Sequence, residues 1–167
     1  TPVLTDGALT GFNVTKGSLT VKGKGLTGAD YTDLLAQKIN LEGKVGTTQL
    51  KAIAGKYTYN RASGQATAST TGRTGGNSID VSALGGATAG LIQLQTTEAG
   101  AGVNNNGVLN ANSLYISTNG TLTNNGTLDA GVMSIAASGS MTNKGTLSAS
   151  QAALQTTNTF TNEGTVK

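Results

Sequence analysis

The sequence NNGVLNANSLYISTNGTLT (residues 105–123) decides the fold, because it returns twice in full and opens a third time. Residues 124–142 read NNGTLDAGVMSIAASGSMT, residues 143–161 read NKGTLSASQAALQTTNTFT, and residues 162–167 begin the next copy. The period is 19 residues, and an Asn-x-Gly signature starts every copy. A fixed period of this length is typical of solenoids, in which each repeat forms one turn of a stack.

Apolar residues keep the same place in every copy. One column holds Leu109, Leu128, Leu147 and Val166, and another holds Ile116, Ile135 and Leu154. Within a copy, Leu114 and Ile116 are two residues apart, which is the spacing of side chains on one face of a strand. A single unit cannot bury this face, whereas units stacked at ~4.8 Å share a continuous core. The sequence therefore predicts an all-β fold, a right-handed parallel β-helix (β-solenoid).

The asparagine that starts each copy forms a polar column of its own. Its members are Asn105, Asn124, Asn143 and Asn162. Stacked amides can hydrogen-bond from one coil to the next, and Asn also tolerates turn geometry. The glycine two residues later is expected to supply a positive φ at little steric cost. We interpret the column as a structural ladder, with ligand binding as the alternative.

The first half of the chain carries the same alternation less regularly. Residues 63–77 lack large apolar side chains, so we expect an excursion from the rod, either mobile or a short hairpin. Residues 30–38 read DYTDLLAQK, and Asp30 can cap a helix while Asp33 lies in its first turn. The sequence therefore predicts one short helix on the side of the solenoid.

Composition excludes several classes of function. The chain has 167 residues, no Cys and no His, so thiol nucleophiles, disulfides and the commonest general base are missing. No apolar run approaches the ~20 residues of a membrane-spanning helix. The net charge is only +3, and the basic residues do not gather beside aromatic ones as in a nucleic-acid groove. We expect no cofactor, metal or nucleic acid.

Two kinds of enzyme, a dinucleotide-binding enzyme and a glycosidase, are the alternatives to a structural chain. Gly23–Gly28 matches G-x-G-x-x-G and Glu42 follows at a plausible distance, as in a dinucleotide-binding loop. The preceding strand alternates polar and apolar residues, whereas the central strand of such a fold is apolar throughout. A glycosidase built on a β-helix would need a carboxylate pair in one groove, and the acidic residues are scattered. We therefore predict a chain that is not an enzyme.

Several segments together resemble filamentous haemagglutinins, the exported partners of two-partner secretion systems. The resemblance rests on these stretches, which follow the order of that family's secretion (haemagglutination-activity) domain: 11–14, 17–21, 25–26, 30–36, 41–43, 50–55, 79–86, 102–103 and 106–107. It covers nearly the whole chain and implies three parts. Residues 1–62 would be the C-terminal part of that domain, 63–77 the excursion, and 78–167 rod repeats of one continuous solenoid.

The resemblance also implies a function. Members of the family are Gram-negative bacterial proteins that cross the outer membrane through a dedicated transporter and are secreted or displayed at the cell surface. They include contact-dependent growth inhibition proteins, whose rods carry a toxin, and adhesins that bind host cells directly. We expect the first, with the adhesin as the alternative, for which Tyr57 and Tyr59 are the only candidates for an exposed aromatic cluster. The family's Asn-Pro motifs, which serve secretion, would lie upstream, and a receptor on a target cell is a possible partner.

Overall fold

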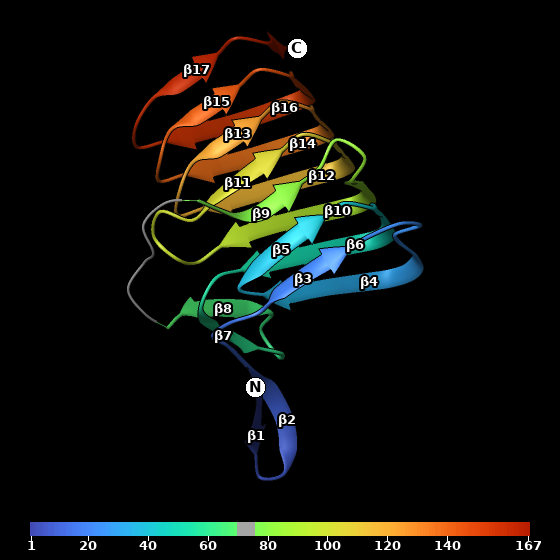
Figure 1. Cartoon of the computed structure of the whole chain (residues 1–167), viewed down its shortest axis with the longest axis vertical. Helices are drawn as coiled ribbons and strands as arrows, with labels where there is room; N and C mark the ends of the chain where they lie inside the picture. The colour runs from blue at the N-terminus through green and yellow to red at the C-terminus, as the bar shows by residue number, and fades with distance from the viewer. Residues whose placement is uncertain (70–75) are drawn as a thin grey trace.

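A computed structural model describes residues 1–69 and 76–167 of the chain, and these residues form β-strands, turns and connecting segments. Most of the strands stack as the rungs of one solenoid, with the N-terminus at its lower end and the C-terminus at its upper end (Figure 1). The strands are β1 Pro2–Thr5, β2 Ala8–Val14, β3 Ser18–Val21, β4 Leu26–Ala36, β5 Lys38–Leu41, β6 Lys44–Ala54, β7 Tyr57–Asn60, β8 Gln65–Ala68, β9 Asn77–Val81, β10 Gly86–Thr96, β11 Gly102–Asn105, β12 Val108–Thr118, β13 Leu122–Asn124, β14 Thr127–Ala137, β15 Met141–Asn143, β16 Thr146–Thr156, β17 Phe160–Asn162 and β18 Thr165–Val166.

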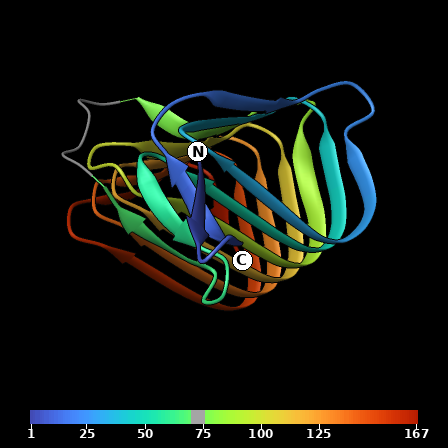
Figure 2. The same cartoon turned by 90° about the horizontal axis from the view of Figure 1, so that it is seen from below.

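Two parallel sheets form the solenoid. The long-strand sheet has the order β18-β16-β14-β12-β10-β6-β4, and the short-strand sheet has the order β17-β15-β13-β11-β9-β5-β3. Each coil contributes one strand to each sheet, so that the coils lie over one another when the molecule is seen from below (Figure 2). The predicted right-handed parallel β-helix is confirmed.

In the regular coils, residues that are 19 apart in the sequence lie opposite each other in adjacent strands. In the pairing of β12 with β14, Leu109 lies opposite Leu128 and Ile116 lies opposite Ile135. These four side chains are at most 2% exposed and belong to one core that runs through the stack. Repetition therefore replaces size as the source of a core, because every coil covers the apolar face of its neighbour.

The predicted helix over residues 30–38 is wrong. Residues 30–36 belong to β4, which pairs in parallel with β6, and Lys38 begins β5. Leu34 and Ala36 point into the solenoid core, while Leu35 between them packs on the opposite face of the sheet. Leu and Ala favour helices locally, but burial on both faces of a paired strand outweighs that preference.

A second, antiparallel sheet of four strands has the order β1-β2-β7-β8. In Figure 1 it lies at the lower end of the solenoid. Tyr57, Tyr59 and Val14 from this sheet pack with Ile53 and Leu35, which face outward from β6 and β4. The antiparallel sheet thus covers the outside of the first coils with a small core of its own.

The predicted excursion over residues 63–77 is described in part. Gln65–Ala68 forms β8, which makes an antiparallel hairpin with β7, and β9 begins at Asn77. Residues 70–75 of the predicted segment lie outside the described residues. The division of the chain at 62 and 77 stays a prediction.

Candidate functional site

The four asparagines that start the repeats end four successive strands of the short-strand sheet, β11, β13, β15 and β17. The Nδ2 atoms of Asn105, Asn124 and Asn143 each donate to the Oδ1 atom of the asparagine one coil later, at 2.8 Å in all three cases. Asn105, Asn124 and Asn143 are buried, whereas Asn162 in the last coil is exposed. The chain of amides runs in one direction, from the N-terminal to the C-terminal coil.

Each amide also holds the turn that leads into the next long strand. Asn124 Nδ2 lies 3.2 Å from Gly126 O in its own coil and 3.1 Å from Thr146 O in the following coil. Asn105 repeats this arrangement with Gly107 O and Thr127 O. One side chain therefore ties together its own turn and the coil above it. That this column acts as a stabilising ladder is our proposal, and it rests on these bonds and on the burial.

The glycines of the signature have a different role from the expected one. Gly107, Gly126, Gly145 and Gly164 are absent from the residues with positive φ. A Cβ atom on Gly126 would instead collide with the backbone oxygen of Gly107 in the coil below, and Gly145 stands in the same relation to Gly126. Glycine is needed here because the backbones of successive turns approach too closely for a side chain.

The asparagine column begins at a definite coil. Asn105 pairs with Val81, Val81 with Leu41, and Leu41 with Val21. The same position is thus aliphatic in the first three coils and polar in the next four. The stacked apolar columns run alongside, with Leu109, Leu128 and Leu147 buried, Leu154 half-buried, and Val166 in the last coil 49% exposed.

Sequence reasoning missed a buried pair of hydroxyls at the opposite edge of the core. Thr96 Oγ1 and Thr118 Oγ1 lie 2.8 Å apart, and both donate to Ala101 O, at 2.7 and 2.9 Å. Both threonines are 2% exposed. Their signal is weak because the coil that contains Thr96 does not follow the period of 19 residues.

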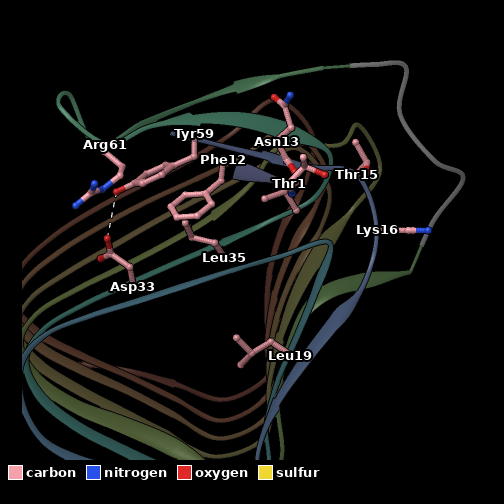
Figure 3. Close-up of a pocket in the computed structure, with 11 residues that line it drawn as sticks. Thr1, Phe12, Asn13, Thr15, Lys16, Leu19, Asp33, Leu35, Tyr59 and Arg61 are labelled. Atoms are coloured by element: carbon pink, nitrogen blue, oxygen red, sulfur yellow. Dashed lines mark hydrogen bonds between the residues drawn. The ribbon is translucent and has the colours of Figure 1, made fainter. Parts of the chain in front are cut away.

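A cavity of 770 Å³ lies between the N-terminal strands and the first coils (Figure 3). Phe12 and Leu35 face each other inside it, and Tyr59 donates a hydrogen bond to Asp33 Oδ2 at 3.2 Å. Burial raises the pKa of Tyr59, and the negative charge of Asp33 raises it further. Tyr57 and Tyr59 are therefore not the exposed aromatic cluster that direct adhesion would use, since they are at most 5% exposed.

The glycine-rich motif of residues 23–28 spans a turn and the start of a strand, because β4 begins at Leu26. Gly25 N donates to Lys22 O at 3.0 Å, and β4 follows where a dinucleotide site would need a helix. Glu42 lies 3.6 Å from the Lys22 ammonium, so it forms an ion pair. In residues 1–69 and 76–167, no three carboxylates gather where they could hold a metal ion. Nor does this part of the chain contain a helix long and apolar enough to cross a membrane.

The architecture defines a class of fold, the parallel β-solenoids. A solved structure described as the filamentous hemagglutinin secretion domain matches 99% of this chain and 57% of its own, with a TM-score of 0.59 and 22% identity, which shows the shared fold. The family model of the TPS secretion domain matches residues 1–130. The chain belongs to the two-partner secretion exoprotein family.

Relatives within the family include large proteins named as toxins. The chain is 33% identical over 127 residues to the Toxin CdiA of Yersinia pestis, and 38% identical over 123 residues to the tRNA nuclease CdiA-2 of Burkholderia pseudomallei. These matches cover 71% and 70% of this chain but only 4% of either relative. The activities in these names therefore belong to proteins far longer than the segment they share with this chain.

Proposed function

We propose that this chain is a non-enzymatic structural segment of an exported toxin-delivery protein that acts in contact-dependent growth inhibition. The observation that carries the proposal is the register of β4 to β18, in which each coil continues the core of the one before. Such a stack can act as a spacer that holds its two ends at a fixed distance along the axis. The relatives named Toxin CdiA favour a toxin carrier. The alternative is an adhesin that binds host cells directly, and the fold shared with the filamentous hemagglutinin secretion domain is compatible with both.

The proposed route is export through an outer-membrane transporter of the two-partner type, followed by folding at the bacterial surface or in the medium. Each coil contacts only its neighbours, so the fold can grow coil by coil as the chain emerges. The absence of Cys means that no disulfide must form during this process. The match of residues 1–130 to the TPS secretion domain supports an interaction with this transporter. A receptor on a target cell is a further proposed partner.

An exchange experiment tests the structural role. In the full parent protein, this segment is replaced by the matching residues of the Toxin CdiA of Yersinia pestis, which are 33% identical. A structural segment tolerates the exchange, so surface display on the producing cells and growth inhibition of co-cultured target bacteria should both persist. Normal display with loss of inhibition would contradict a purely structural role. Adherence to host cells without inhibition of bacteria by the unaltered parent would favour the adhesin.

A further inference from the structure

The outer face of the long-strand sheet carries a polar groove beside the tip of the β7–β8 hairpin. Two cavities, of 590 and 370 Å³, lie on this face. Both are lined by Lys51, Ser63, Gly64 and Gln93, so they meet around the hairpin tip. Lys51 Nζ donates to Gly64 O at 3.0 Å and so fixes the tip against the sheet.

The floor of the groove is one column of outward-facing side chains. In successive coils, Asp33 lies opposite Lys51, Lys51 opposite Gln93, Gln93 opposite Tyr115, and Tyr115 opposite Ser134. Neighbouring strands are about 4.8 Å apart, so these groups follow one another along the axis at a fixed step. A linear ligand laid along the axis would meet a charge, an amide, a phenol and a hydroxyl in turn.

Aromatic rings stand exposed among these polar groups. Tyr115 is 42% exposed and lines the larger cavity, while Tyr31 is 72% exposed and lines the smaller one. A sugar ring presents an apolar face that stacks on an aromatic ring and a rim of hydroxyls that pairs with amides. Gln93, Gln95 and Ser117 surround Tyr115 with such partners.

The charge of the groove selects among glycans. The smaller cavity is lined by two cations, Lys51 and Arg61, and by one carboxylate, Asp33. Asp33 accepts a hydrogen bond from the Tyr59 hydroxyl. Lys51 Nζ also lies 5.8 Å from the centre of the Tyr59 ring. Lys51 also donates to Gly64 O and Arg61 donates to Leu9 O, but these carbonyl oxygens are neutral. Two cations therefore face one carboxylate, and this balance favours an anionic ligand.

We propose that this groove binds a linear glycan whose sugars carry carboxylates. A sugar ring stacks on Tyr115, and a carboxylate faces Lys51 and Arg61. An extended peptide is disfavoured because β6, β10 and β12 are interior strands, with no free edge to which a peptide strand could add. This binding site is independent of the structural role proposed above.

Isothermal titration of this chain with an oligomannuronate tests the proposal, since that probe is linear and carries a carboxylate on every sugar. The matched neutral probe is a manno-oligosaccharide of the same linkage and length. We expect saturable binding of the acidic probe and markedly weaker binding of the neutral one. Removal of the ring in Tyr115→Ala should weaken binding by about tenfold, as loss of one stacking platform does elsewhere. Tyr115→Phe keeps the platform and should bind within a few-fold of the unaltered chain.

Val132→Ala is the control, because Val132 is 41% exposed on the same sheet but does not line the groove. It should leave both affinity and thermal stability unchanged. The proposal is overturned if the oligomannuronate does not bind saturably, or if Tyr115→Ala binds as well as the unaltered chain. Equal affinity for the neutral probe would refute the choice of an acidic glycan. An oligoglutamate peptide that binds as tightly, with the same dependence on Tyr115, would refute the choice of a glycan.

Discussion

Replacement of one asparagine in the middle of the ladder should destabilise the solenoid more than replacement at its end. The change Asn124→Ala removes the bond from Asn105 Nδ2 and the bond to Asn143 Oδ1, both 2.8 Å long. It also removes the partly buried contacts of Asn124 Nδ2 with Gly126 O at 3.2 Å and with Thr146 O at 3.1 Å. Two buried bonds at about 1 kcal/mol each, these two weaker contacts, and a buried Asn143 oxygen that loses a donor give a cost of about 3–5 kcal/mol.

The matched control is Asn162→Ala. Asn162 is exposed in the last coil and accepts one ladder bond from Asn143. Its loss should cost about 0.5–1.5 kcal/mol, the net contribution of a single hydrogen bond. Because the two residues share the same place in the repeat, local propensity is the same in both variants.

Urea unfolding followed by far-ultraviolet circular dichroism measures the difference in free energy. Hydrogen exchange shows which coils are destabilised, because solenoids can open coil by coil and need not unfold in one step. The strands β11, β13 and β15 should lose protection together in Asn124→Ala. A free energy of unfolding for Asn124→Ala that equals that of Asn162→Ala would refute the ladder.

Three further substitutions probe the core, the turn and the covering sheet. Leu128→Asp places an unpaired charge at a fully buried position, so denaturant titration should show a loss above about 4 kcal/mol. Gly126→Ala drives a Cβ atom into Gly107 O and should lower the free energy of unfolding by about 1–3 kcal/mol, by the same titration. Tyr57 donates to Ile53 O at 2.6 Å, and burial raises its pKa. Above pH ~10 the phenol of Tyr57 ionises in the unfolded chain but stays protonated in the folded one, which favours unfolding. The free energy of unfolding of the unaltered chain, relative to that of Tyr57→Phe, should therefore be constant below pH ~10 and fall by about 1.4 kcal/mol per pH unit above it.

The coils of residues 105–167 could be predicted from the sequence because the repeat in the sequence and the coil in the structure have the same length there. Leu109, Leu128 and Leu147 lie opposite one another in the sheet at the spacing that the sequence shows. In the first coils, the register partners Val21, Leu41 and Val81 follow one another at unequal intervals. Insertions such as β7 and β8 leave the solenoid between two coils, so no fixed period survives in the sequence.

The errors arise where distant residues decide local structure. The sequence predicts a helix over residues 30–38 because Asp30 can cap it and Asp33 lies in its first turn. The pairing of β4 with β6 and the covering sheet decide the outcome instead. The glycines after the ladder were assigned to positive φ, but the neighbouring coil excludes their side chains. The groove beside Tyr115 was not predicted, since it joins residues of β6, β10 and β12 to the tip of a hairpin. A single sequence does not show which outward columns meet.

Disulfide mapping tests the stacking of successive coils most directly, because the chain has no cysteine of its own. Thr123 and Thr142 are half-buried register partners in adjacent strands, whereas Thr161 pairs with Thr142 and so lies two coils from Thr123. Adjacent strands place the Cα atoms about 5 Å apart, within reach of a disulfide, and two coils place them beyond the limit of about 7 Å. The chain with Thr123→Cys and Thr142→Cys should close an intramolecular disulfide under mild oxidation, and the chain with Thr123→Cys and Thr161→Cys should remain reduced. Closure of the second pair but not the first would contradict the stacked register.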